Sequence, residues 1–150
     1  MGHTASIACG MAVGTNENIY CIDGDGSFLM HMGSLPVIAE KAPQNLKYIL
    51  MNNGSHESVG GQPTVALKID CAGILKASHF EHVLEARTEN EIRVGIEFMS
   101  KNKLCAMIIY CEKGSRDNLG RPTTTPIENK KNFMRAIKQR NAVIEKKSNC

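Results

Sequence analysis

The chain has 150 residues, of which 42% are hydrophobic and 22% charged, the size and composition of a single folded domain with its own core. A net charge of +3 with little clustering before the C-terminal region, the absence of tryptophan and the absence of any long apolar run argue against nucleic-acid partners and membrane insertion. The six cysteines form no CxxC pair and lie mostly in apolar runs, so we expect buried thiols in a reduced, cytoplasmic protein.

Apolar runs and helical patterns alternate along the sequence. The expected elements, in order, are a helix at 4–11, a strand at 19–22, a helix at 32–41, a strand at 46–51, a helix at 64–77, a strand at 80–86, a helix at 88–101, a strand at 104–111 and a last helix. Strands that alternate with helices and consist of continuous apolar runs predict a three-layer α/β domain. Its sheet is expected to be mainly parallel, with helices on both faces.

The last helix has a clear start signal. Thr125 is its expected N-cap, Pro126 lies in the first turn, and Glu128 is placed to complete a capping box. Phe133 and Ile137 are expected on its inner face.

Polar breaks follow two of the expected strands. Residues 19–22 are followed by DGDGS, and residues 46–51 are followed by NNG. In a parallel sheet both breaks lie at the carboxyl ends of strands, where open α/β sheets bind ligands. The carboxylate of Asp25 and the amide oxygen of Asn53 are oxygen ligands of the kind that Mg²⁺ prefers.

The backbone around Asp25 is suited to a phosphate group. Gly24 and Gly26 allow a sharp turn and close approach to a ligand, and the amides of Gly26 and Ser27 can donate to phosphate oxygens. Together with the metal ligands, this pattern predicts a metal-bridged diphosphate site. Two alternatives remain open: glycine-rich turns that only join strands, and a nucleotide-binding domain, although no GxGxxG fingerprint is present.

The spacing of these motifs resembles a known cofactor signature. GDG at 24–26, followed after 25 residues (27–51) by NN at 52–53, is similar to the signature of thiamine-diphosphate-dependent enzymes. Three longer blocks resemble the phosphonopyruvate decarboxylases of that family: IDGDGSFLMHMGSLPVIA, NNGSHESVGGQPTVA and GRPTTTPIENK. This resemblance covers Met1 to about Phe133. It implies the thiamine-diphosphate-binding fold, the cofactors thiamine diphosphate and Mg²⁺, and decarboxylation of a 2-oxo acid such as phosphonopyruvate to phosphonoacetaldehyde and CO₂.

The resemblance also implies roles for individual residues. Asp25 and Asn53 would bind the metal through their side chains, and Ser55 would bind it through its backbone carbonyl. Met1 matches a position that supports the bent cofactor, with an initiator methionine as the equal alternative. The remaining residues implied at the cofactor are Gly24, Gly26 and Ser27.

Candidate residues for catalysis and substrate binding follow the asparagine pair. His56 and Glu57 are expected near the reactive end of the cofactor, where a histidine can transfer protons or meet an anionic group. An exposed loop histidine is the alternative. Gln62 is expected to line the substrate cleft. Three cations are candidates for a phosphonate by position alone, with surface solvation as the alternative: Lys113, Arg116 and Arg121.

The resemblance further implies that the site is shared. In this family a long upstream region, which holds the pyrimidine-binding domain and the first part of the present one, precedes the position of Met1. We therefore expect residues 1–150 to be a single, N-terminally incomplete diphosphate-binding domain. It would act on a small 2-oxo acid only with a pyrimidine-binding domain or subunit, in a homo- or hetero-oligomer. The cofactor-binding subunit of a split sulfopyruvate decarboxylase and a truncated, non-catalytic module remain alternatives.

Overall fold

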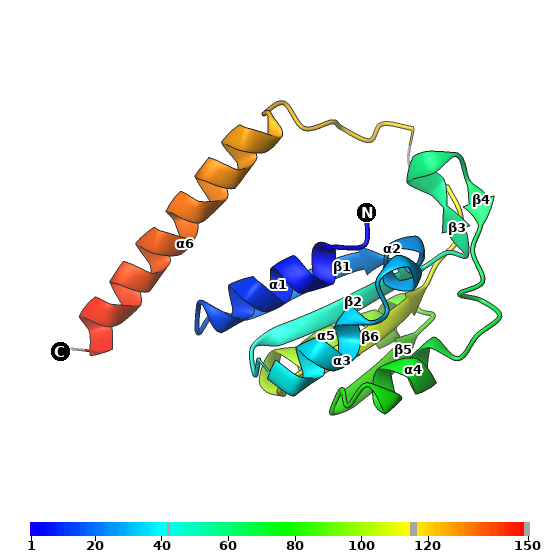
Figure 1. The fold of residues 1–150 in the computed structure, drawn as a ribbon, viewed down its shortest axis with the longest axis horizontal. Coiled ribbons are helices and arrows are strands. Elements are labelled where there is room, and N and C mark those ends of the chain that lie inside the picture. The colour runs from blue at the N-terminus through cyan, green and yellow to red at the C-terminus, as the bar shows by residue number, and fades with distance from the viewer. Residues whose placement is uncertain (42, 115–116, 149–150) are drawn as a thin grey trace. The chain divides into compact units, whose positions relative to one another are not determined.

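A computed structural model describes the backbone of residues 1–41, 43–114 and 117–148, and the side chains of these ranges up to residue 140. The chain divides into two units, Met1–Gly114 and Ser115–Cys150. The first unit holds the sheet and most helices, and the second holds one long helix, α6 (Figure 1).

The first unit is built on a parallel sheet of four strands in the order β1-β2-β6-β5. The central strands β2 and β6 are buried along almost their whole length, as their continuous apolar sequences predict. At one edge of the sheet, the end of β1 lies beside the end of β2, with Gly24 opposite Met51. The strands are β1 (Ile19–Gly24), β2 (Leu46–Asn52), β5 (His82–Ala86) and β6 (Cys105–Tyr110).

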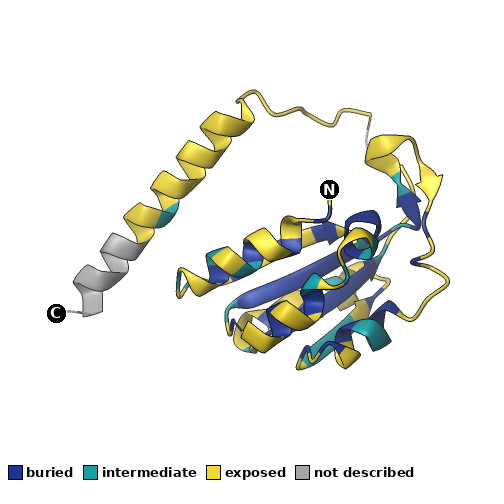
Figure 2. Cartoon of the chain, in the orientation of Figure 1, coloured by how far each residue is buried: buried dark blue, intermediate teal, exposed yellow. Residues whose placement is uncertain are grey.

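Helices cover both faces of this sheet. Helices α1, α3 and α4 contribute residues such as Ala8, Leu35 and Leu75 to one core, and α5 contributes Met99 to a second core on the other face (Figure 2). The predicted α/β class, with a mainly parallel sheet and helices on both faces, is therefore confirmed. The bounds are α1 (Thr4–Val13), α3 (Ser34–Lys41), α4 (Cys71–Ala77) and α5 (Glu89–Lys101).

Two segments without predicted regular structure contain short elements. The chain enters α2 directly at Asp25, so the polar break after β1 is the first turn of a helix. After β2, residues of the NNGSHESVGGQP segment form a small antiparallel hairpin, which Gly60 and Gly61 close with positive φ angles of 119° and 75°. These elements are α2 (Asp25–Met30), β3 (Ser55–His56), the 3₁₀ helix η1 (Glu57–Val59) and β4 (Gln62–Pro63).

The predicted helix at 64–77 is wrong in its first half. Residues 64–70 form turns, and α4 begins only at Cys71. Asp70 ends the irregular segment, because its carboxylate accepts a hydrogen bond from the Gly73 amide at 2.7 Å and caps the helix. The hydroxyl of Thr64 is occupied by a distant carboxylate, which a local sequence pattern cannot reveal.

The predicted start of the last helix is confirmed. Helix α6 (Pro126–Ser148) follows Thr125, whose amide donates to the Glu128 carboxylate at 2.8 Å and whose hydroxyl accepts from the Glu128 amide at 3.3 Å. Phe133, predicted to lie on an inner face, is 47% exposed. Among the helices of the described residues, none is long and apolar enough to cross a membrane.

The described cysteines agree in part with the prediction of buried thiols. Cys21, Cys71 and Cys105 are buried, Cys9 is half-buried and Cys111 is exposed. All five are free thiols. Cys150 lies outside the described residues.

Candidate functional site

A polar pocket of about 300 Å³, hereafter the strand-end pocket, lies where β1 runs into α2. Chain segments far apart in sequence meet there: the N-terminus, the β1–α2 junction and the hairpin after β2. The lining residues are Met1, Thr4, Ile22, Asp23, Gly24, Asp25, Gly26, Ser27, Ser55, His56, Glu57 and Ser58. The position agrees with the prediction of a ligand site at the carboxyl ends of neighbouring strands.

Asp25 is the central carboxylate of this pocket. It is the first residue of α2 and is only 2% exposed. A carboxylate buried to this degree needs hydrogen-bond or cation partners. The hydroxyl of Thr64 donates to its Oδ2 atom. Thr64 is thus a site residue that our sequence reasoning missed, since we had assigned it to a helix.

Asp23 is a second buried carboxylate on the pocket wall. The Tyr48 hydroxyl donates to its Oδ2 atom at 3.1 Å, and the Gly24 amide donates to its Oδ1 atom at 3.1 Å. Burial of the phenol, followed by the charge of Asp23, raises the pKa of Tyr48. The phenol therefore keeps its proton and remains a donor to Asp23 across the neutral pH range.

The imidazole of His56 packs directly against Gly26. A Cβ atom built at Gly26 would lie 2.2 Å from Nδ1 of His56, so only glycine allows the hairpin to approach α2 this closely. Within the described part of the chain, this Nδ1 atom is buried and has no hydrogen-bond partner. A buried polar atom without a partner in a pocket wall is suited to a ligand group or a proton-transfer role.

Glu57 ties the hairpin to the segment after β6. Its Oε1 atom accepts a hydrogen bond from the amide of Gly114. Nearby, the Cys111 amide donates to the Asn52 carbonyl at 3.1 Å, which extends the pairing of β6 with β2 toward the pocket. One oxygen of the predicted catalytic carboxylate is therefore engaged by the backbone.

The N-terminus is fixed at the pocket through Gly2. Its amide donates to Oγ of Ser27 at 3.1 Å in a buried hydrogen bond. Gly2 has a φ angle of +88°, and a Cβ atom there would lie 2.2 Å from Nδ1 of His31, so this position requires glycine. The bond and the close contact hold Met1 at the pocket wall.

Some predicted site residues do not line the strand-end pocket. Asn53 is half-buried, and its Oδ1 atom accepts from the amide of Ser55 at 3.0 Å. Gln62 is exposed and pairs with His56 in the hairpin. Among the candidate cations, Lys113 is exposed and does not line this pocket, Arg121 is exposed and belongs to the second unit, and Arg116 lies outside the described residues.

The residues at the pocket fit a magnesium–diphosphate group in their chemistry. Asp25 supplies a hard anionic oxygen beside the close approach at Gly26, and His56 has an unpartnered nitrogen. The described residues contain no cluster of three or more histidine, cysteine, aspartate or glutamate side chains that could hold a metal by themselves. Mg²⁺ in proteins usually takes part of its coordination from phosphate oxygens and waters rather than from protein side chains alone.

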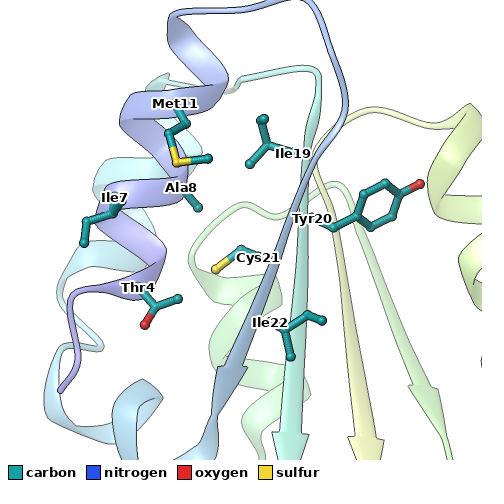
Figure 3. A pocket seen from close by; sticks show the side chains of 8 residues that line it. All are labelled: Thr4, Ile7, Ala8, Met11, Ile19, Tyr20, Cys21 and Ile22. Carbon is teal, nitrogen blue, oxygen red and sulfur yellow. The ribbon is translucent and has the colours of Figure 1, made fainter. Parts of the chain in front are cut away.

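A second pocket, hereafter the edge pocket, lies between α1 and β1 and has a volume of about 370 Å³ (Figure 3). Its wall contains no charged side chain. The lining residues are Thr4, Ile7, Ala8, Met11, Ile19, Tyr20, Cys21 and Ile22. An apolar wall of this kind offers an anionic cofactor no compensating charge.

The first unit is an α/β domain with a polar pocket at the carboxyl ends of parallel strands, which is where open sheets of this kind bind ligands. Residues 1–108 match the family model described as the thiamine pyrophosphate enzyme, C-terminal TPP binding domain. The chain therefore belongs to the thiamine pyrophosphate enzyme family. Enzymes of this kind use thiamine diphosphate together with Mg²⁺.

Similar proteins of known function include two kinds of decarboxylase. Phosphonopyruvate decarboxylase from Streptomyces viridochromogenes is 31% identical over 134 residues, which cover 89% of this chain and 34% of the relative. Sulfopyruvate decarboxylase subunit beta from Methanococcus maripaludis is 30% identical over 139 residues, which cover 93% of this chain and 75% of the relative. The chain thus spans about a third of the matched phosphonopyruvate decarboxylases and three quarters of that beta subunit.

Two solved structures have the same fold as this chain. An X-ray structure from Mycobacterium smegmatis, described as a thiamin diphosphate-dependent enzyme, aligns with a TM-score of 0.65 at 14% identity over 77% of this chain and 22% of its own. Transketolase from Campylobacter jejuni aligns with a TM-score of 0.51 at 19% identity over 73% of this chain and 18% of its own. At such identities the likeness shows the fold alone.

Proposed function

We propose that this chain binds the diphosphate of thiamine diphosphate, with Mg²⁺, at the strand-end pocket, and that it supplies this half of the active site of a 2-oxo acid decarboxylase. The observation that supports the proposal is the composition of the pocket wall. It contains the predicted cofactor residues Met1, Gly24, Asp25, Gly26, Ser27 and Ser55. Their residue types suit a metal-bridged diphosphate.

Each element of the pocket has a proposed role in holding the cofactor. Asp25, Asn53 and the backbone carbonyl of Ser55 are the proposed metal ligands. Asn53 would need its loop to direct a lone pair toward the metal, since its Oδ1 atom accepts from the amide of Ser55. The amides of Gly26 and Ser27, in the first turn of α2, would donate to diphosphate oxygens.

When bound, thiamine diphosphate would supply the electron sink that decarboxylation of a 2-oxo acid requires. His56 is the proposed proton donor or anion-binding group, because its Nδ1 atom is buried at the pocket without a partner among the described residues. Glu57 is a weaker candidate, since the Gly114 amide already engages its carboxylate. Gln62 is also a weaker candidate, since it is exposed and does not line the strand-end pocket.

Phosphonopyruvate is the proposed substrate, and sulfopyruvate is the second candidate. Relatives named for the two substrates match this chain at similar identity, 31% and 30%. The sequence blocks SVGGQPT and RPTTTP favour the phosphonate. The match over 75% of a beta subunit favours the role of one subunit in a two-chain enzyme.

Completion of the active site would require a pyrimidine-binding domain or subunit. The matched phosphonopyruvate decarboxylases are about three times as long as the region shared with this chain. Residues 1–150 would then form a single diphosphate-binding domain that is inactive alone. Release of CO₂ from phosphonopyruvate by the purified chain, without any partner, would overturn this part of the proposal.

The test of cofactor binding is a calorimetric titration of the purified chain with thiamine diphosphate, with and without Mg²⁺. We expect binding that requires the metal. Absence of metal-dependent binding would contradict the proposal and favour a non-catalytic module. After reconstitution with a pyrimidine-binding subunit, comparison of CO₂ release from phosphonopyruvate and sulfopyruvate would identify the substrate.

A further inference from the structure

We infer that Thr64 is a positioning residue that holds the two arms of the metal and diphosphate site in register. One arm is the β1–α2 junction with Asp25, and the other is the turn at 53–55 that follows β2. The inference rests on the proposed function, because it concerns the orientation of the groups proposed to bind the metal. Thr64 itself is not expected to touch the metal, the cofactor or the substrate.

The first contact is between side chains. The hydroxyl of Thr64 donates its single proton to Oδ2 of Asp25, across 39 positions of sequence, in a buried environment. The hydroxyl oxygen of Thr64 also accepts a hydrogen bond from the Ala66 amide at 3.3 Å. Because the hydroxyl proton is directed by this acceptor contact, it has a defined orientation toward Asp25. One carboxylate oxygen is thereby fixed, and Oδ1 remains for a metal ion.

The second contact joins Thr64 to the other arm through the backbone. Its amide donates to the carbonyl of Gly54 at 2.9 Å. Gly54 lies between Asn53 and Ser55, the two other proposed metal ligands. Thr64 therefore contacts Asp25 through its side chain, and through its backbone amide it contacts the turn that carries Asn53 and Ser55.

The surrounding contacts make this link rigid. Asn52 is fully buried, its Nδ2 atom donates to the Ala66 carbonyl at 3.3 Å, and its Oδ1 atom accepts from the Gly54 amide at 3.3 Å. Gly54 has a φ angle of +68°, and a Cβ atom there would lie 2.5 Å from Cδ1 of Leu67. The turn therefore cannot shift freely when the hydroxyl contact is lost, and the main expected consequence is a free rotation of the Asp25 carboxylate.

Groups that orient metal ligands typically change metal affinity by about 10- to 100-fold when they are removed. We expect Thr64→Val, which keeps the shape of the side chain and removes the hydroxyl, to weaken Mg²⁺-dependent binding of thiamine diphosphate by a factor in this range. Thr64→Ser restores the donor and should retain most of the affinity. Calorimetric titration at several Mg²⁺ concentrations measures both variants against the original chain.

A matched control separates positioning from general loss of stability. Thr88→Val also removes a threonine hydroxyl. Thr88 is far in sequence from the residues of the strand-end pocket, and its hydroxyl caps α5 by accepting a hydrogen bond from the Glu91 amide. The Thr88→Val variant should lower the midpoint of thermal unfolding without changing the affinity for the metal and cofactor. Thermal unfolding of all variants without metal shows whether each is folded.

The possible outcomes are distinct. If the original chain does not bind thiamine diphosphate with Mg²⁺, the proposed function fails. If the original chain binds and Thr64→Val binds equally well, the positioning role is wrong while the proposed function stands. Equal losses of affinity in Thr64→Val and Thr64→Ser would also overturn the positioning role, because serine keeps the hydroxyl. A loss in the valine variant alone supports it.

Discussion

The strand-end pocket and the edge pocket share strand β1 but differ in chemistry. The strand-end pocket collects two buried carboxylates, Asp23 and Asp25, with backbone amides and an imidazole, whereas the edge pocket is lined without any charged group. The difference follows from position along the strand. Along β1, the backbone pairs with β2 on one side, and the residues of α1 and β1 that line the edge pocket carry no charge. Beyond its carboxyl end, backbone amides and polar side chains are released from the sheet and can face a ligand.

Asp25→Asn should produce the largest effect at the strand-end pocket. The change removes the negative charge while keeping the shape, so the affinity for thiamine diphosphate with Mg²⁺ should fall by roughly 100-fold or more, at or beyond the range for residues that only orient ligands. Calorimetric titration measures the loss. Unchanged affinity would show that Asp25 is not a metal ligand and would remove the main distinction between the two pockets.

Gly26→Ala should have the next largest effect. The added Cβ atom would lie 2.2 Å from Nδ1 of His56 and displace the imidazole or the hairpin. Overpacking of this kind costs about 1–3 kcal/mol, which corresponds to a loss of roughly 5- to 150-fold if it appears in cofactor binding. Calorimetry and chemical denaturation together show how the cost is divided between binding and folding.

Gly33→Ala is the control for Gly26→Ala. A Cβ atom at Gly33 would meet no atom within 4 Å, and its backbone does not require glycine. We expect binding and stability close to those of the original chain. Equal losses at both glycines would mean that the contact with His56 is not the cause.

Tyr48→Phe should affect stability rather than binding. It removes the donor to the buried carboxylate of Asp23 and should lower the free energy of unfolding by about 1–3 kcal/mol, measured by chemical denaturation. The loss of stability is expected because the buried carboxylate of Asp23 needs hydrogen-bond donors, and the variant removes one of them. Unchanged stability would indicate that Asp23 is satisfied without the phenol.

The same variant gives a test against pH. The folded state raises the pKa of Tyr48, so the unfolded chain, with a tyrosine pKa of about 10, loses this proton first. The unfolded state then binds fewer protons, and the free energy of unfolding falls as the pH rises above about 10. Tyr48→Phe should show a smaller fall over this interval than the original chain.

Ile7→Ser, a change in the wall of the edge pocket, should have the smallest effect. Ile7 is 62% exposed and lines the edge pocket but not the strand-end pocket. We expect a change in the free energy of unfolding of about 0.5 kcal/mol and unchanged affinity for thiamine diphosphate. A loss of affinity comparable to that of Asp25→Asn would show that the edge pocket, rather than the strand-end pocket, holds the cofactor.

The sequence alone was sufficient to predict where the strand-end pocket forms. Alternating strands and helices predict a parallel sheet, and in such a sheet the residues after each strand meet at one edge. This reasoning places Asp25 and Asn53 at the same edge, and the pocket contains Asp25 but not Asn53, whereas Ser55, which the family resemblance implied, does line it. The error at residues 64–70 arose because local propensity favoured a helix, whereas the Thr64 hydroxyl bonds to a carboxylate 39 positions away.

The periodicity of the sequence determined the class of fold and the edge of the sheet at which polar residues gather, because both depend on local patterns that repeat along the chain. Only the tertiary structure decided which of these residues touch: the Thr64–Asp25 hydrogen bond, the contact of His56 with Gly26, and the position of Asn53 off the pocket wall. Such contacts depend on how loops of different strands pack together. For the Thr64–Asp25 hydrogen bond, the physical cause is the need of a buried carboxylate for partners, and a distant segment supplies this partner only after the chain has folded.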